Sequence, residues 1–405
     1  MDCSPSRKAA SSSSHAVTPT GGGGGGGGGG VSENPTPNPN PNLPSDIISN
    51  ILLRLPVKSL GKFKAVSKQW LAAITDPHFI RTRRERSLQN PNLLLLRTSY
   101  EDRDVEPGKP FHHTKKTMVD ICAQSFDGKH NAEFKIEVDD IIELLPSKWD
   151  LICFIGETGF YACNPSTQQL VKLPEASCCT SGDINAGMGY ISSRNEFVLI
   201  HLFDRCLDFS VEYDIGCEIM RFTDGCVTNA SWKVVEASCP YVVRGWGVLV
   251  ENVFYWMIWD PYDHPGLDAI VSFDLESEEF GTVEPPKGCL DPNGDWSLVE
   301  LTGLLCLIDC TSKPSTMDIW VLKDYENHVW VKKHSIDLSR FEDELCKFII
   351  PLDQQDEEIL IDSKQDSIEY YNLENKSFNR MHKLSDGEWT WIRLYTESFF
   401  SLQAP

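Results

Sequence analysis

The sequence predicts a multi-domain chain: a disordered tail, a small all-α domain of three short helices, and a mainly β domain built as a β-propeller of about six blades. Three observations support this. Residues 1–42 are of low complexity, residues 43–86 repeat apolar side chains at helical spacing, and residues 91–402 alternate apolar and polar side chains between short turns. We therefore predict domain boundaries near residues 42 and 91.

The first segment cannot build a hydrophobic core. It contains a serine run, ten consecutive glycines from Gly21 to Gly30, and alternating asparagine and proline. The glycine run lacks the flanking strand, the Lys-Ser/Thr pair and the following helix of a phosphate-binding loop. We expect residues 1–42 to form a tail without fixed structure.

Three short helices are expected next. Apolar residues from Ile47 to Leu55 recur at steps of three and four, as on one face of a helix. Pro56 ends this helix and begins a second one, and a third runs from about Ser67 to Asp76. Helices this short bury little surface by themselves, so we expect a partner to cover their apolar faces.

The β region contains an internal repeat. Three segments, CNPSTQQL at 163–170, FDLESEEF at 273–280 and YNLENKSF at 371–378, place an apolar residue six positions after Asn or Asp. This pattern is typical of a hairpin whose Asn or Asp caps the turn. The steps of 110 and 98 residues each hold two units of about 50 residues. A pair of β-sandwiches is the competing architecture, but repetition favours a propeller.

Composition limits where the protein works. The 405 residues contain no apolar run approaching the roughly 20 residues that cross a bilayer, and the N-terminus lacks the apolar segment of a signal peptide. The 14 cysteines are scattered, many of them in apolar runs. We expect no membrane association and a reducing compartment, the cytoplasm and/or the nucleus.

Charge is unevenly distributed. The chain carries −22 overall, but Arg54 to Arg86 contains nine basic and two acidic residues, a local charge of +7. The overall charge argues against a nucleic-acid partner. The local excess indicates either an acidic partner or a solvated helical face.

No motif of a known catalytic or metal site is present. The sequence lacks C-x-x-C zinc spacing, G-x-S-x-G, H-E-x-x-H and a Walker loop. Cys206, Cys217 and Cys226 lie near His201 and could hold a metal, but idle thiols are the simpler interpretation. We predict no catalytic residue, no metal and no cofactor.

Two segments resemble parts of plant F-box proteins. LPSDIISNILLRLPVKSLGKFKAVSKQWLAAITDPHF, residues 43–79, resembles the F-box, departing at Ser67 where many members have cysteine. Residues 163–167, 231–234 and 317–321 resemble loose motifs of the F-box-associated interaction domain. No Gly-Gly pair follows residue 30, so the blades differ from kelch repeats proper.

The resemblance implies a substrate-recognition subunit of an SCF (Skp-cullin-F-box) ubiquitin ligase. The F-box would dock on a Skp-family adaptor, and through it on cullin and a RING subunit. The propeller would hold an unidentified substrate protein for ubiquitination and proteasomal degradation, without catalysing the transfer. A non-degradative binding scaffold is the alternative, followed by a propeller enzyme.

The resemblance and the apolar helix faces together nominate contact residues for the adaptor. These are Leu43, Pro44, Ile47, Ile51, Leu55, Pro56, Val57, Leu60 and Trp70. For substrate binding, two loops rich in aromatic residues are candidates, although such residues also cap hydrophobic cores. They contain Trp259, Tyr262, His264 and Trp296.

Overall fold

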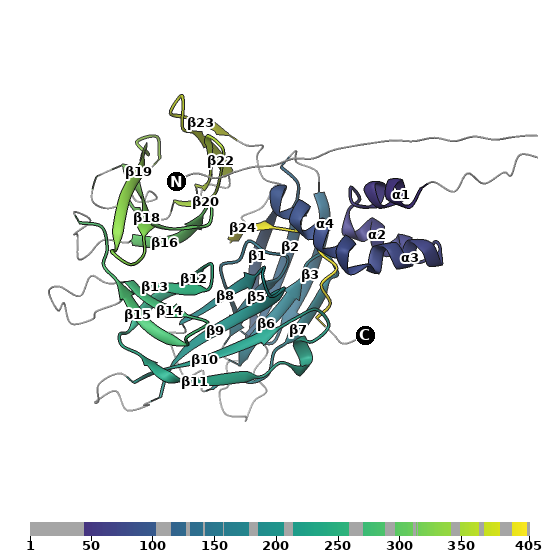
Figure 1. Cartoon of the computed structure of the whole chain (residues 1–405), viewed down its shortest axis with the longest axis horizontal. Coiled ribbons are helices and arrows are strands. Elements are labelled where there is room, and N and C mark those ends of the chain that lie inside the picture. Colours follow the sequence, from purple (N-terminus) through teal and green to yellow (C-terminus); the bar gives the residue numbers. More distant parts are fainter. Residues whose placement is uncertain are drawn as a thin grey trace, which may run out of the picture. The chain divides into compact units, whose positions relative to one another are not determined.

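The computed structural model describes thirteen continuous stretches and the single residue Lys313. The stretches are 44–102, 115–126, 130–140, 142–156, 158–177, 185–205, 214–258, 270–287, 296–310, 315–341, 349–363, 368–380 and 391–402. The tail predicted for residues 1–42 lies outside them. Helices come first and strands follow (Figure 1). No helix within these stretches combines the length and apolarity needed to cross a membrane.

The helical part contains one helix more than the three predicted. Its helices are α1 (Ser45–Leu52), α2 (Val57–Phe63), α3 (Lys68–Thr75) and α4 (Pro77–Gln89). The Ser67 hydroxyl caps α3 by accepting a hydrogen bond from the Trp70 amide at 3.1 Å. Asp76 ends α3 and also caps α4, because its Oδ1 accepts from the amides of His78 and Phe79. The Asp-Pro pair therefore starts a helix as well as ending one.

The strands of the described residues form six groups of four, with the innermost strand first in each group. Blade 1 is β24 (Trp391–Tyr395), β1 (Asn92–Asp102), β2 (Lys115–Gln124) and β3 (His130–Val138); blade 2 is β4 (Ile142–Leu144), β5 (Ile152–Gly156), β6 (Gly159–Asn164) and β7 (Gln169–Lys172). Blade 3 is β8 (Asn185–Ile191), β9 (Glu196–Asp204), β10 (Ile215–Phe222) and β11 (Trp232–Cys239); blade 4 is β12 (Val243–Val250), β13 (Val253–Ile258), β14 (Ile270–Asp274) and β15 (Glu279–Val283). Blade 5 is β16 (Trp296–Leu301), β17 (Leu304–Asp309), β18 (Thr316–Asp324) and β19 (Val329–Asp337); blade 6 is β20 (Ile350–Gln355), β21 (Glu358–Asp362), β22 (Ile368–Asn372) and β23 (Ser377–Arg380).

Hydrophobic clusters between successive blades close these groups into a ring. Each of six clusters joins side chains of two neighbouring blades, and the last joins blade 6 to blade 1. Representative pairs, from blades 1 and 2 onward, are Leu94 with Phe154, Phe160 with Phe197, Ile200 with Phe254, Tyr255 with Leu305, Ile319 with Ile361, and Leu360 with Leu93. This arrangement confirms the predicted propeller of about six blades.

The predicted hairpins are the connections between third and fourth strands. In blades 2, 4 and 6 the side-chain oxygens of Asn164, Asp274 and Asn372 accept hydrogen bonds from backbone amides two or three residues later, at 2.7 to 3.1 Å. The fourth residue after each has a positive φ of 57°, 57° and 54°. The sequence repeat is therefore a repeat of turn geometry.

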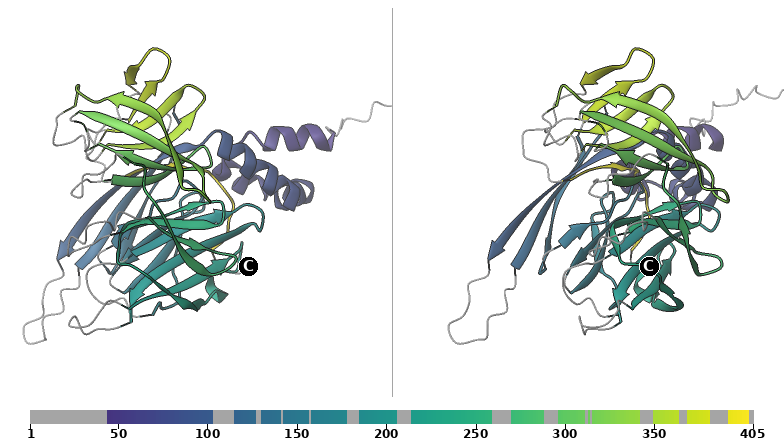
Figure 2. Two further views of the ribbon diagram at one scale, coloured as in Figure 1. Left: turned by 60° about the vertical axis from the view of Figure 1, so that its left-hand side comes forward. Right: turned by 90° about the vertical axis from the view of Figure 1, so that its left-hand side faces the viewer.

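The ring closes through strands far apart in sequence. β24 pairs antiparallel with β1, from Asn92 opposite Tyr395 to Leu96 opposite Trp391. In both views of Figure 2 the yellow β24 lies beside the blue strands of blade 1. Blades 3 and 4 join more closely through Gly187 opposite Gly247. A Cβ on Gly247 would lie 2.7 Å from the Trp256 ring, so a larger residue would force the strands apart.

Candidate functional site

The four helices share a small core of their own. Ile48, Leu52, Leu60, Ile74 and Phe79 are buried together. Half-buried aromatic residues close its rim, where two rings of α2 and α3 meet edge to face with centroids 5.1 Å apart. The core uses only one side of each short helix.

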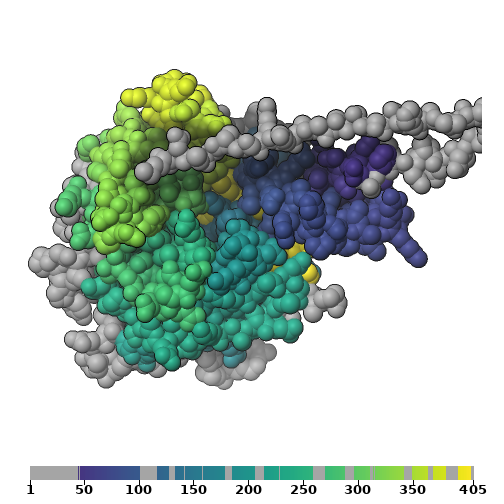
Figure 3. All heavy atoms as spheres, viewed as in Figure 1, coloured from purple at the N-terminus to yellow at the C-terminus, as the bar shows by residue number. Residues whose placement is uncertain are grey.

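The opposite sides of these helices leave apolar side chains in solvent. Ile47 and Ile51 on α1 are 45% and 46% exposed, and Val66 and Leu71 are 61% and 43% exposed. These are four of the nine exposed large apolar residues in the described part of the chain. The surface of α1 to α3 is drawn in purple and blue in Figure 3. Apolar residues this concentrated mark an interaction surface.

Basic residues surround this apolar surface. Arg54, Lys58, Lys62 and Lys68 are exposed. Lys64 instead lies over the ring of Phe399 at 4.4 Å, near the C-terminal end of the described chain. The exposed basic residues therefore remain available to an acidic partner.

Two other basic residues of this stretch fasten α4 to the propeller. Arg83 pairs with Glu397 at 3.1 Å, and Glu397 Oε2 also accepts from the Val57 amide at 3.0 Å. Burial lowers the pKa of Arg83, and Glu397 opposes that shift. Arg84 pairs with the buried Asp150 at 2.5 Å, and its guanidinium lies 3.6 Å from the centroid of the Tyr190 ring. These contacts hold the helices in a fixed orientation on the ring.

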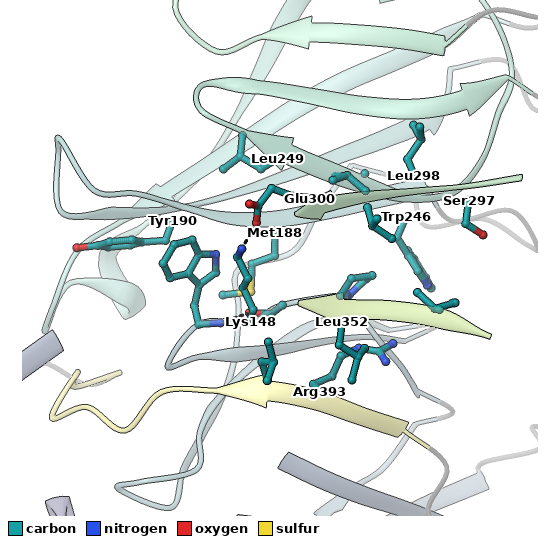
Figure 4. Close-up of a pocket in the computed structure, with 18 of the residues that line it drawn as sticks. Lys148, Met188, Tyr190, Trp246, Leu249, Ser297, Leu298, Glu300, Leu352 and Arg393 are labelled. Atoms are coloured by element: carbon teal, nitrogen blue, oxygen red, sulfur yellow. Dashed lines mark hydrogen bonds and ion pairs between the residues drawn. The ribbon is translucent and has the colours of Figure 1, made fainter. Parts of the chain in front are cut away.

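A cavity of about 1050 Å³ lies among the innermost strands of the blades. Its lining comes from β8, β12, β16, β20 and β24, together with the loop before β5. Aromatic and aliphatic side chains make up most of the wall, including Trp246, Leu249 and Met188 (Figure 4).

Charged groups enter this cavity from several blades. Lys148 of blade 2 pairs with Glu300 of blade 5, and the two side chains point toward each other in Figure 4. Burial lowers the pKa of Lys148, and Asp353 opposes that shift. Arg393 on β24 also lines the wall; burial lowers its pKa, and Asp362 opposes that shift.

Buried thiols in the described blades are held in the protonated form. Burial raises the pKa of Cys122, Cys239 and Cys306 to about 11. Within the described stretches no three His, Cys, Asp or Glu side chains gather as metal ligands would. Of the cysteines considered as ligands, Cys217 is buried in blade 3, Cys226 is exposed, and Cys206 lies outside the described residues.

Comparison with known families places these two parts. Residues 41–82 match the F-box domain, and residues 110–393 match the F-box associated beta propeller domain. The second match alone covers more than half of the chain. The chain belongs to the F-box-associated propeller family.

Individual relatives agree with this family. F-box protein CPR1 of Arabidopsis thaliana is 26% identical over 372 residues, which cover 84% of each chain. F-box protein At1g30790 of the same plant is 28% identical over 311 residues, covering 72% of this chain and 74% of the relative. The predicted resemblance to plant F-box proteins is thereby confirmed.

Likeness to solved structures is much weaker. A mutant of the Synechocystis apocarotenoid oxygenase superposes with a TM-score of 0.33 at 11% identity, covering 60% of this chain and 61% of that one. A superposition of this quality carries no argument about function.

The F-box places the nominated adaptor residues in three environments. Pro44, Ile47, Ile51 and Pro56 are exposed, and Leu55 and Trp70 are half-buried. Val57 and Leu60 are 3% and 0% exposed, so their side chains belong to the chain's own interior. Leu43 lies outside the described residues.

The nominated substrate residues separate as well. Trp259, Tyr262 and His264 lie outside the described residues. Trp296, expected in a loop, instead begins the innermost strand of blade 5 and lines the cavity. No local signal could have identified Glu397 or Asp150 as partners of α4, because they lie 314 and 66 residues from the arginines that they bind.

Proposed function

We propose that this F-box protein is the substrate-recognition subunit of an SCF ubiquitin ligase, acting in the cytoplasm or nucleus. The F-box would bind a Skp-family adaptor and, through it, cullin and a RING subunit. The propeller would hold a target protein for ubiquitination and degradation. The exposed apolar surface of α1 to α3 is the observation that carries the proposal.

The proposed adaptor contact combines this apolar surface with its basic surroundings. Ile47 and Ile51 would enter a hydrophobic groove, flanked by Pro44 and Pro56. The exposed arginine and lysines would favour an acidic adaptor and speed its association. Val57 and Leu60 are left out of this contact, because they already pack inside the F-box.

The proposed role requires no catalytic residue in this chain. A receptor accelerates transfer by holding the target lysine close to the conjugating enzyme, which turns a bimolecular encounter into a local one. Local concentration depends on a fixed orientation between the two binding domains. The ion pairs of Arg83 and Arg84 support such an orientation.

The first test is capture of a Skp-family adaptor by the full chain and by an Ile47→Ser/Ile51→Ser variant. We expect the variant to lose at least about 2 kcal/mol of binding, or thirtyfold in affinity, because apolar anchors dominate such interfaces. Capture would be measured by pull-down and by titration calorimetry.

Val329→Ser/Val331→Ser is the matched control, since these valines on the outer strand of blade 5 are 45% and 47% exposed. Equal adaptor capture by both variants would refute the proposed contact. Normal adaptor capture, with target abundance unchanged when the proteasome is blocked, would favour the non-degradative scaffold instead.

A further inference from the structure

We infer that the central cavity of the propeller is a binding site for a small organic acid with a flat, largely apolar body and one anionic group. The inference concerns the propeller alone and does not rest on adaptor binding.

The size and wall of the cavity suit a small molecule. Its volume of about 1050 Å³ is comparable with the roughly 300–1,000 Å³ of typical ligand pockets. Three indole rings line it from different parts of the ring: Trp149 before β5, Trp246 on β12 and Trp296 on β16. Such rings offer flat apolar faces to a planar ligand body.

The anionic group is indicated by Arg393. Among the described residues its guanidinium makes one hydrogen bond, from Nη1 to the carbonyl of Ile392 at 2.8 Å, and its Nε has no partner. A buried donor without an acceptor is costly, and a carboxylate can fill two guanidinium positions together. Burial lowers the pKa of Arg393, so a bound anion would also stabilise its charge.

The neighbouring charges leave this role to Arg393. Lys148 is already paired with Glu300, which extends from the opposite blade of the ring. The Trp296 indole Nε1 is likewise buried without a partner, and it gives the wall a second unused donor. Two unused donors in a mainly apolar wall favour a ligand that brings acceptors on a small apolar body.

A peptide fits this wall less well. Each peptide residue brings a backbone N–H and C=O that need partners when buried, and a mostly apolar wall supplies few. The observations therefore favour a small acid over an inserted segment of a target protein.

The test uses two dyes with the full chain. 8-Anilinonaphthalene-1-sulfonate has a flat apolar body and one anionic group, and N-phenyl-1-naphthylamine is its neutral counterpart. Binding would be followed by energy transfer from tryptophan to dye. We expect one saturable site, with the Arg393→Met variant binding the anionic dye about tenfold more weakly and the neutral dye unchanged.

Two further variants separate the cavity from the surface. Leu298→Trp, on a cavity-lining residue of β16, should weaken both dyes by reducing the space, and Arg393→Lys should recover part of the anionic dye's affinity. The Ile47→Ser/Ile51→Ser and Val329→Ser/Val331→Ser variants should keep the site. Thermal melting would check that each variant is folded.

The inference is overturned if both dyes bind the cavity variants as tightly as the natural chain, or if only the surface variants lose binding. It is also overturned if no dye binds while Leu298→Trp abolishes capture of a target protein, since the cavity would then hold a peptide. If Arg393→Met fails to fold, the comparison between Arg393→Lys and Leu298→Trp decides.

Discussion

At the scale of the residue, Glu397 joins the two domains. Its carboxylate accepts from Arg83 at 3.1 Å and from the Val57 amide at 3.0 Å, so one side chain contacts both α4 and α2. Arg83 is only 7% exposed. Removing the carboxylate would leave a buried charge without its partner, which is costlier than losing an exposed ion pair.

The Glu397→Gln variant should loosen the F-box on the propeller. The amide can still accept a hydrogen bond, but it no longer compensates the charge of Arg83, and we expect a loss of about 3 kcal/mol in protection. Hydrogen exchange in α2 and α4 would measure this change. Glu374→Gln, on an exposed turn of blade 6, is the matched control, and identical exchange in both variants would contradict the prediction.

At the scale of the element, blade 5 is held together by a buried carboxylate. Asp318 on β18 accepts from Lys332 at 2.5 Å and from Ser335 at 2.6 Å, both on β19. Burial raises the pKa of Asp318, but these hydrogen bonds and the lysine charges outweigh it, so the pKa falls below the ordinary value of 3.8. The carboxylate form therefore stabilises this blade.

Acid should weaken blade 5 through Asp318. Because its folded pKa is lowered, its contribution is complete above pH 3.8 and is lost as the pH falls through the folded value. The Asp318→Asn variant should be less stable near neutral pH by about 1–3 kcal/mol and should lose less stability on acidification. Denaturant unfolding from about pH 3 to about pH 7 would measure both effects.

Glu326→Gln, exposed on the turn between β18 and β19, is the control for that experiment. A variant at Asp318 that keeps the full acid dependence of the natural chain would show that another group carries it.

Elements were predictable where their signals are local. The turns at Asn164, Asp274 and Asn372 follow from side chains that bond amides two or three residues away. Helix α4 was missed because Asp76 and Pro77 satisfy the rules for ending one helix and for starting another. Choosing between them requires knowing that α4 has the propeller to pack against.

At the scale of the whole molecule, the ring depends on its last strand. β24 supplies the innermost strand of blade 1, and its Ile392 and Leu394 join the cluster between blades 1 and 6. In the described residues every blade contacts two neighbours through such clusters. A weak closure would therefore weaken the entire ring.

The Ile392→Ala variant should lower the free energy of unfolding of the propeller by about 2–5 kcal/mol, because it opens a cavity at the closure. Val329→Ala, on the outer strand of blade 5 and 45% exposed, should cost less than about 1 kcal/mol. Denaturant midpoints would compare the two. Equal midpoints would mean that closure through β24 contributes little.

The ring could be predicted from sequence, but its functional surfaces only in part. Repeated turns fixed the number of units, whereas the cavity arises only when inner strands from separate blades meet. Arg393, Trp296 and Lys148 lie up to 245 residues apart, and nothing near any one of them signals the others. Likewise, Val57 and Ile51 have the same helical period, and only packing shows which one is buried.

The order of the chain sets a timetable for synthesis. The F-box leaves the ribosome first, but β24 and Glu397 follow every other strand of the ring. A nascent chain can therefore fold its F-box and several blades long before it can lock them together. A premature stop codon after blade 6 would release a protein with a complete F-box on an unclosed ring. Such a product would compete for adaptor without presenting a target in the correct orientation.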